Sequence, residues 1–306
     1  MIMDTALHTV ASAPAKQGGV SAHTGALVVG AGAPVVLLHS SLSSKSQWTA
    51  LTERLAPRFR VIALDLLGYG DNAMPSAPES FTLDDEVRLV GETIDRLLPP
   101  HVRVHVVGHS YGASVALKFA QRSRGRVASL ALYEPVAFGM LDRDDAALAE
   151  VKRIAESVPR LIGAGARLQA AEAFVDFWSG PGSYGRLARP VQLHVARNIA
   201  KVPLDFKAVM SWPLGPESVR SIAVPALLLT GSQSPAVAQG IVAQLARSLP
   251  KRYVGRIDAG HMGPVTAPHL VNPWIEAFID MCVEHAASSA MTTITDSRAP
   301  FAAAAD

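Results

Sequence analysis

The segment Gly108-His109-Ser110-Tyr111-Gly112 constrains the fold of this chain more than any other stretch. It follows a run of β-formers at residues 102–107 and precedes a run at 113–120 that is typical of a helix. Strand, Gly-x-Ser-x-Gly and helix in this order predict a sharp turn that exposes the serine hydroxyl above a sheet edge. Glycine fits the two flanking positions because larger side chains would collide in such a turn. We therefore predict that Ser110 is a nucleophile.

Segments typical of strands and of helices alternate along most of the chain. Expected strands cover residues 26–29, 34–39, 59–65, 102–107, 127–133, 224–230 and 253–258, and expected helices cover 47–56, 82–98, 113–120, 235–249 and 268–284. Continuous apolar runs such as 34–39 suit strands that are buried on both faces. The alternation predicts an α/β fold with a doubly wound, mostly parallel sheet.

The alternation stops between residues 139 and 212, where the chain indicates helices and loops without a strand. We interpret this block as a helical cap inserted over the carboxyl edge of the sheet, where ligands bind in open α/β folds. Residues 25–138 and 213–285 then form the core. Residues 1–24 and 286–306 are rich in small polar residues and alanine, so we expect a disordered lead-in and a disordered tail.

Composition excludes several classes of partner. The 306 residues include 28 basic and 26 acidic side chains, and no basic cluster with interleaved aromatics indicates a nucleic-acid surface. No stretch reaches the roughly 18 to 20 apolar residues of a membrane span, and the first twenty or so residues lack a secretory signal pattern. The single cysteine, Cys282, excludes an internal disulfide and favours a reducing, cytoplasmic location. Oligomeric state stays open.

A serine nucleophile needs a base, and the base needs an orienting acid. His261 is the predicted base because it lies in a glycine-rich loop after the last expected strand. The loop before that strand, 231–235, carries no carboxylate, so Glu134 at the end of the strand after the elbow helix is the predicted acid. Asp258 lies too far back to reach the imidazole. A Ser–His dyad assisted by Ser234 is the remaining alternative.

An oxyanion hole needs two N–H donors. Tyr111 supplies one, because its amide lies at a helix N-terminus, and the loop after residues 34–39 supplies the other, the amide of Ser41 beside Ser40. We expect His39 to hold this loop by hydrogen bonds and the side chain of His109 to point away into packing.

Large aromatic residues of the cap segment are candidates for an acyl or aromatic pocket, and packing between cap helices is the equal alternative. They are Phe174, Phe177, Trp178 and Trp212, and the last three, together with Ser40, are the residues predicted to bind substrate. No metal is expected, because His101, His105 and His109 fall on a strand, where four residues span roughly 13 Å. No dinucleotide or phosphate-binding glycine motif follows a strand, so no cofactor is expected.

Taken together, five segments resemble the α/β-hydrolase fold family. They are Leu37-Leu38-His39-Ser40-Ser41, Asp65-Leu66-Leu67-Gly68-Tyr69-Gly70, the Ser110 segment, Leu132-Tyr133-Glu134-Pro135 and Gly260-His261-Met262. The resemblance implies that Ser110 and His261 are nucleophile and base, that Ser41 and Tyr111 are oxyanion donors, and that the cap is the family's insertion. Two positions depart from the pattern: Ser40 replaces a usual glycine, and Ser234 a usual aspartate. Some members carry the acid after the earlier strand, which suits Glu134.

The resemblance implies a soluble serine hydrolase, most simply a carboxylesterase that acts on a small-molecule ester or acyl substrate. Epoxide hydrolases and dehalogenases of the family use a carboxylate nucleophile, so Ser110 argues against them. Three alternatives stay open: a non-hydrolytic or slow binding protein on the same scaffold, a carbon–carbon bond hydrolase, and a cofactor-free perhydrolase or haloperoxidase. The second would hold a substrate carboxylate with Arg186, Arg189 or Arg197 of the cap.

Overall fold

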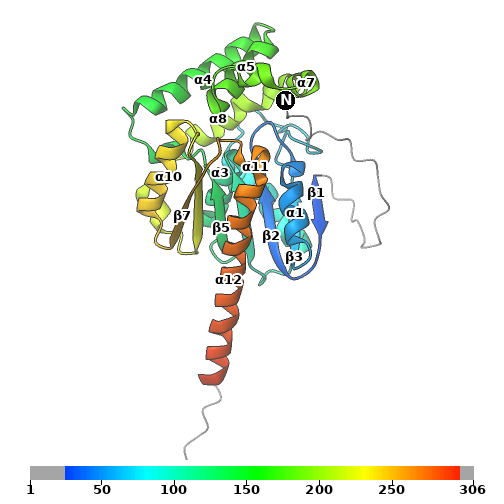
Figure 1. Cartoon of the computed structure of the whole chain (residues 1–306), viewed down its shortest axis with the longest axis vertical. Coiled ribbons are helices and arrows are strands. Elements are labelled where there is room, and N and C mark those ends of the chain that lie inside the picture. The colour runs from blue at the N-terminus through cyan, green and yellow to red at the C-terminus, as the bar shows by residue number, and fades with distance from the viewer. Residues whose placement is uncertain (1–24, 297–306) are drawn as a thin grey trace, which may run out of the picture.

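A computed structural model describes residues 25–296 of the chain, with side chains for residues 25–288. Seven strands form one sheet in the order β1-β3-β2-β4-β5-β6-β7 (Figure 1). Their bounds are β1 Ala26–Val29, β2 Ala33–Leu38, β3 Phe59–Leu64, β4 Val104–His109, β5 Val127–Tyr133, β6 Ala226–Gly231 and β7 Arg252–Ile257. Only β1 pairs antiparallel, with β3, and the other pairs are parallel. The predicted doubly wound, mostly parallel α/β fold is confirmed.

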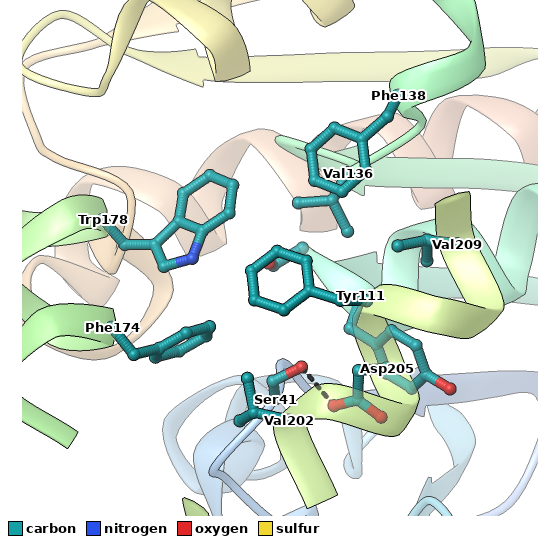
Figure 2. A pocket seen from close by; sticks show the side chains of 11 residues that line it. Ser41, Tyr111, Val136, Phe138, Phe174, Trp178, Val202, Asp205 and Val209 are labelled. Carbon is teal, nitrogen blue, oxygen red and sulfur yellow. Dashed lines mark hydrogen bonds between the residues drawn. The ribbon is translucent and has the colours of Figure 1, made fainter. Parts of the chain in front are cut away.

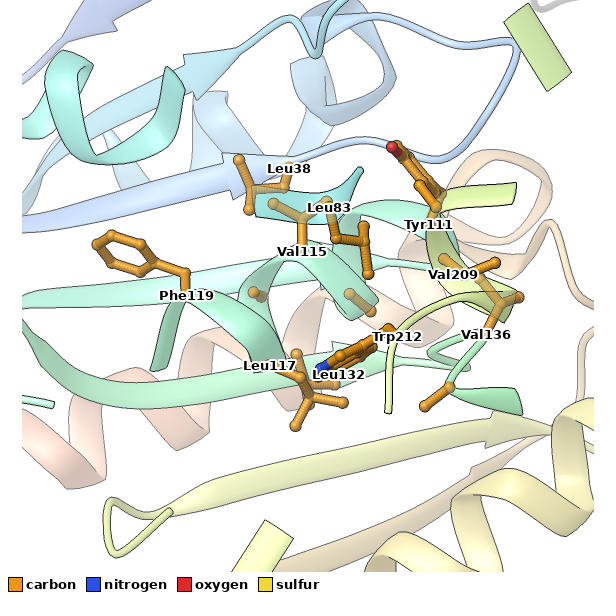
Figure 3. Packing of buried hydrophobic residues seen from close by; sticks show 14 of the residues in the cluster. Leu38, Leu83, Tyr111, Val115, Leu117, Phe119, Leu132, Val136, Val209 and Trp212 are labelled. Carbon is orange, nitrogen blue, oxygen red and sulfur yellow. The ribbon is translucent and has the colours of Figure 1, made fainter. Parts of the chain in front are cut away.

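Helices cover both faces of the sheet, and each face has its own apolar core. One core joins the sheet to α2 (Leu83–Leu97), α3 (Tyr111–Arg122) and α10 (Ala236–Ser248), and part of it is drawn in Figure 3. The other joins it to α1 (Thr49–Leu55) and α12 (Pro268–Asp296). Along β2, Val36 and Leu38 face the first core whereas Val35 and Leu37 face the second, because successive strand side chains alternate. This alternation explains the continuous apolar run in the sequence.

The segment expected to form the cap is helical, and the described residues 139–212 contain no strand. Its helices are α4 (Ala146–Gly163), α5 (Arg167–Ser179), α6 (Ser183–Arg186), α7 (Arg189–Asn198) and α8 (Val202–Met210). Figure 1 shows these green helices gathered beyond one end of the strands. Short helices α9 (Pro216–Arg220) and α11 (Gly263–Thr266) and 3-10 turns at Lys45–Trp48, Phe138–Met140 and Ile199–Lys201 complete the elements.

The expected tail is partly wrong, because α12 continues to Asp296 instead of ending near residue 285. Val271, Ile275 and Ile279 fix the early turns of α12 against the sheet. Residues 286–296 then contain alanine and no glycine or proline, so nothing in the sequence stops the helix from continuing. Residues 1–24 and 297–306 lie outside the described residues, so their expected disorder stays a prediction.

We expect Leu132→Ala in β5 to lower the free energy of unfolding by about 2–5 kcal/mol, the usual cost of a leucine-sized cavity in a packed core. Leu132 is 0% exposed and belongs to the core drawn in Figure 3. Urea unfolding followed by circular dichroism measures the change. Leu168→Ala is the matched control, because Leu168 is 39% exposed and its loss should change stability by no more than about 0.5 kcal/mol. Equal losses for both variants would contradict this account of the core.

Candidate active site

The turn between β4 and α3 holds Ser110 in a backbone conformation that few non-glycine residues adopt. Its φ is 54° and its ψ is −114°. A Cβ at Gly108 would lie 2.5 Å from Ala113 Cα, and a Cβ at Gly112 would lie 2.4 Å from the His39 carbonyl oxygen. Both glycines are therefore required by close backbone approach, as the sequence motif predicted. The turn leaves Ser110 at the carboxyl end of β4.

Three predicted side chains from distant parts of the chain lie in one hydrogen-bonded row. His261 Nδ1 lies 2.7 Å from Glu134 Oε2, and His261 Nε2 lies 3.0 Å from Ser110 Oγ. An ionised carboxylate only accepts hydrogen bonds, so Nδ1 donates to Glu134 and Nε2 is left to accept from the Ser110 hydroxyl. All three residues are buried. The geometry is that of a nucleophile, a base and an orienting acid.

Glu134 is fixed by the neighbouring strand β6. It has a φ of 46°, and its Oε1 accepts from the Gly231 amide at 2.7 Å and from Thr230 Oγ1 at 2.8 Å. These bonds leave Oε2 for His261. Burial by itself raises the pKa of Glu134, but hydrogen bonding and charge interaction with His261, aided by Ser234 and the Gly231 amide, bring it below the usual 4.5. The carboxylate is therefore ionised at neutral pH.

The two alternative groups do not contact the imidazole. Asp258 accepts from Ser232 Oγ at 2.9 Å and from Gln233 Nε2 at 3.1 Å. Ser234 Oγ is buried beside Glu134 but has no hydrogen bond of ordinary geometry. Ser234 is thus a neighbour of Glu134, and the carboxylate that bonds to His261 comes from the end of β5.

The loop that carries His261 is supported by groups that the sequence did not single out for that purpose. His109 Nε2 lies 2.8 Å from the His261 carbonyl oxygen, and the Tyr133 hydroxyl donates to the Gly260 carbonyl at 2.7 Å. The indole of Trp178 stacks on the imidazole with ring centres 4.4 Å apart. Burial lowers the pKa of His109 well below 6.5, so this ring is neutral. His109 does pack inside the protein as expected, and it packs against the histidine loop.

The expected oxyanion donors are available. Within residues 25–296, neither the Ser41 amide nor the Tyr111 amide donates to another protein group. His39 holds the neighbouring loop as predicted, since Nδ1 lies 2.7 Å from the Ser40 carbonyl oxygen and Nε2 accepts from the Leu66 amide at 2.9 Å. Burial lowers the pKa of His39 to about 4, so it is neutral.

A narrow pocket lies between Ser110 and the cap (Figure 2). Its lining is mostly apolar and consists of Ser41, Ser110, Tyr111, Val136, Phe138, Phe174, Trp178, Val202, Asp205, Phe206 and Val209. The pocket is partly open to solvent, and its volume is about 20 Å³, little more than one water molecule needs. An acyl group larger than that would displace lining side chains or extend through the opening.

Of the four residues predicted to bind substrate, Trp178 lines this pocket, and so does Phe174, the other aromatic candidate of the cap. Ser40, Phe177 and Trp212 do not line it. Phe177 packs edge-on against Trp178, with ring centres 5.0 Å apart. The Ser40 hydroxyl donates a hydrogen bond to Gln47 Oε1 at 2.9 Å. Trp212 lies in the core between sheet and helices, where the Lys118 ammonium is 5.9 Å from the centre of its ring (Figure 3).

Phe138, Phe206 and Asp205 also line the pocket, and the sequence did not predict them there. The last two lie on α8, a nine-residue helix, and the first lies in a three-residue 3-10 turn. Elements this short show little hydrophobic periodicity, so the sequence alone does not tell which face meets the active site. Residues 25–296 contain no cluster of three or more acidic, histidine or cysteine side chains suited to a metal, and no helix there is long and apolar enough to cross a membrane.

A family model described as the alpha/beta hydrolase family matches residues 35–274. The chain belongs to the alpha/beta hydrolase family. Among curated relatives of this hydrolase, a haloalkane dehalogenase from Agrobacterium fabrum is 36% identical over 118 residues, which cover 39% of the chain and 37% of the relative. A putative 2-succinyl-6-hydroxy-2,4-cyclohexadiene-1-carboxylate synthase from Bacillus subtilis is 26% identical over 80% of the chain and 89% of the relative.

A solved structure of a thermophilic esterase from Thermogutta terrifontis, with malate bound, is 26% identical to this hydrolase. It aligns with a TM-score of 0.63 over 84% of the chain and 93% of the esterase. The chain spans only 37% of the length of the dehalogenase, so that activity is not carried over. The comparisons support the general class of hydrolase.

The lowered pKa of Glu134 predicts a pH-dependent contribution to stability. Because the folded carboxylate holds its proton less tightly than the unfolded one, ionised Glu134 stabilises the fold above the usual pKa of 4.5. The stability advantage of wild type over Glu134→Gln should therefore be full at neutral pH and shrink as the pH falls below 4.5. Urea unfolding between about pH 7 and about pH 3 measures it.

Glu156→Gln is the matched control, because Glu156 is an exposed residue of α4. Its stability should follow that of wild type across the whole range. An advantage of wild type over Glu134→Gln that stayed constant or grew on acidification would show that the carboxylate is not stabilised in the folded state.

Proposed function

We propose that this protein is a serine hydrolase that cleaves a carboxylic ester, or a related acyl bond, through an acyl-enzyme on Ser110. The observation that carries the proposal is the row from Ser110 Oγ through the His261 imidazole to Glu134, with distances of 3.0 Å and 2.7 Å. The apolar pocket beside Ser110 suits an uncharged acyl group.

In the proposed reaction, Ser110 Oγ attacks the ester carbonyl while His261 Nε2 takes the hydroxyl proton. Glu134 keeps the other ring proton on Nδ1 and stabilises the imidazolium that forms. The amides of Ser41 and Tyr111 donate to the oxyanion, and His261 returns the proton to the leaving alcohol. Water then repeats the cycle on the acyl-enzyme and releases the acid.

Several observations weigh against the alternatives. A carbon–carbon bond hydrolase would need a cation for the substrate carboxylate, yet none of the candidates Arg186, Arg189 and Arg197 lines the pocket. Arg186 donates to the Pro181 carbonyl, and Arg189 donates to Gln192 Oε1. Asp205, an acidic residue, does line the pocket. The binding-protein alternative was motivated by the missing aspartate at position 234. Glu134 provides a carboxylate instead, and it accepts a hydrogen bond from the His261 imidazole. Dehalogenase chemistry would need a carboxylate where this chain has Ser110.

Ser110 should react with a fluorophosphonate probe, because an activated serine attacks phosphorus as it attacks a carbonyl. Peptide mass spectrometry should find the adduct on Ser110 and on no other serine. Labelling should fall to background in Ser110→Ala and in His261→Ala. Wild-type protein that stays unlabelled where a control esterase labels fully would overturn the proposal and favour a ligand-binding protein. Peroxide-dependent halogenation without ester turnover would favour a perhydrolase.

Replacing the acid should slow catalysis without removing the nucleophile. We expect Glu134→Gln to lower kcat on short-chain p-nitrophenyl esters by roughly 10² to 10⁴, because the imidazole loses its orienting carboxylate. Ser234→Ala is the matched control, since Ser234 is buried beside Glu134 but makes no hydrogen bond of ordinary geometry with it. Its kcat should stay close to wild type. The reverse order of the two effects would show that Glu134 is not the acid.

A further inference from the structure

A buried polar cluster lies beneath the pocket, and the proposed reaction does not use it. Its charged members are Glu86 of α2, Lys201 at the end of the last 3-10 turn, and Asp205 of α8, which are 0%, 1% and 4% exposed. The hydroxyls of Tyr69 and Tyr111 border the same cluster. Burying three ionisable side chains costs free energy of folding, so their arrangement needs a physical explanation.

Lys201 is the centre of the cluster. Its ammonium donates to Asp205 Oδ1 at 2.5 Å and to Glu86 Oε1 at 3.2 Å, and it lies 4.5 Å from the centre of the Phe81 ring. Burial by itself lowers the pKa of Lys201, but the two carboxylates raise it above the usual 10.5. Lys201 is therefore a permanent cation that offsets the charge of Asp205.

The other oxygen of Asp205 reaches the loop of the proposed oxyanion hole. Asp205 Oδ2 accepts from Ser41 Oγ at 2.6 Å, drawn as the dashed line in Figure 2, and from the Tyr69 hydroxyl at 2.5 Å. Its oxygens thus have three donors from the protein, counting Lys201, so it is poorly placed to act as a substrate ligand. Ser41 belongs to the core and Asp205 to the cap, so this bond joins the two.

The loop around Ser41 needs such support. The next residue, Leu42, has a φ of 61°, a conformation that costs energy for a side chain of this kind. Core groups hold both flanks of the loop, because the Ser40 amide donates to Gln47 Oε1 at 3.1 Å and the Lys45 amide donates to Asp65 Oδ1 at 2.6 Å. The Ser41 hydroxyl itself donates to Asp205 at 2.6 Å. The Tyr69 hydroxyl, which donates to the same Asp205 oxygen, also interacts with Ser41 and with the Leu42 backbone.

We propose that Asp205 is a positioning residue: held by Lys201, it fixes Ser41 so that the Ser41 amide points to the oxyanion of the substrate. The inference rests on the proposed serine hydrolase function. The cap thus completes the oxyanion hole in addition to covering the pocket. A preorganised donor stabilises the transition state more than the ground state, so loosening it lowers kcat more than it raises KM.

The test compares Ser41→Ala, Asp205→Asn and the double variant on short-chain p-nitrophenyl esters, together with the rate of fluorophosphonate labelling of Ser110. Removing an oxyanion donor outright costs roughly 10² to 10³ in kcat, so loosening one should cost about tenfold. We expect that drop in kcat and in labelling rate for each single variant, with KM within about twofold. The double variant should be no slower than the slower single variant, because both changes break the same bond.

Asp176→Asn is the matched control within the cap. Asp176 accepts from the amides of Gly182 and Tyr184 at 2.7 Å and 2.8 Å, away from the pocket lining, so this variant should keep the wild-type kcat. Asp205→Asn leaves Lys201 with Glu86 as its counter-ion. If that variant nevertheless fails to fold, the kcat and labelling rate of Ser41→Ala test the inference, because this variant breaks the same hydrogen bond by removing one hydroxyl and no charge.

Each outcome separates the inference from the function on which it rests. Wild-type protein that reacts, with variants that keep its kcat and labelling rate, overturns the role of Asp205 and leaves the serine hydrolase intact. A higher KM at unchanged kcat would show that Asp205 contacts substrate, and fully additive losses would show that the two residues act separately. Wild-type protein that neither labels nor turns over esters overturns the proposed function itself.

Discussion

The close approach of the β4–α3 turn to the end of β2 is the constraint on which the rest of the site depends. A Cβ at Gly112 would lie 2.4 Å from the His39 carbonyl oxygen and 2.5 Å from that of Leu38, so only glycine permits this contact. The contact brings Ser110 beside the loop that follows β2. Ser110 and the two amides proposed as oxyanion donors therefore follow two neighbouring parallel strands, whose carboxyl ends meet at one edge of the sheet.

Backbone strain is concentrated at this edge. Among residues 25–296, the non-glycine residues with positive φ are Leu42, Ser110 and Glu134. Ser110 and Glu134 directly follow β4 and β5, and Leu42 lies in the loop after β2. Such conformations persist only where surrounding contacts enforce them. Here the enforcing contacts are specific: the Ser110 amide donates to the Tyr133 carbonyl at 2.9 Å, and the Glu134 amide donates to the Leu229 carbonyl at 3.0 Å. The sheet hydrogen bonding thus continues past the strands and sets the direction of the reactive side chains.

Side chains of the cap contact the residues at this edge of the sheet. Trp178 of α5 stacks on the imidazole at 4.4 Å, and Asp205 of α8 holds the Ser41 hydroxyl at 2.6 Å. His261 and Glu134 are 3% and 0% exposed, and such burial strengthens the electrostatic interaction between them. The pocket between cap and core is narrow, and aromatic side chains form much of its lining.

The sequence by itself determined the α/β class, the turn at Ser110 and the strand-end positions of Glu134 and His261, because strand and helix periodicity and glycine requirements are local properties of a chain. From the sequence we expected Trp212 in the pocket and the end of α12 near residue 285, and both expectations were wrong. The burial of an aromatic ring and the length of a helix depend on distant partners. Only the tertiary structure decided that Glu134, and not Ser234 or Asp258, bonds to His261. It alone also showed that Asp205, paired with Lys201, bonds to Ser41. Those contacts join residues more than a hundred positions apart, and no periodicity in the sequence records them.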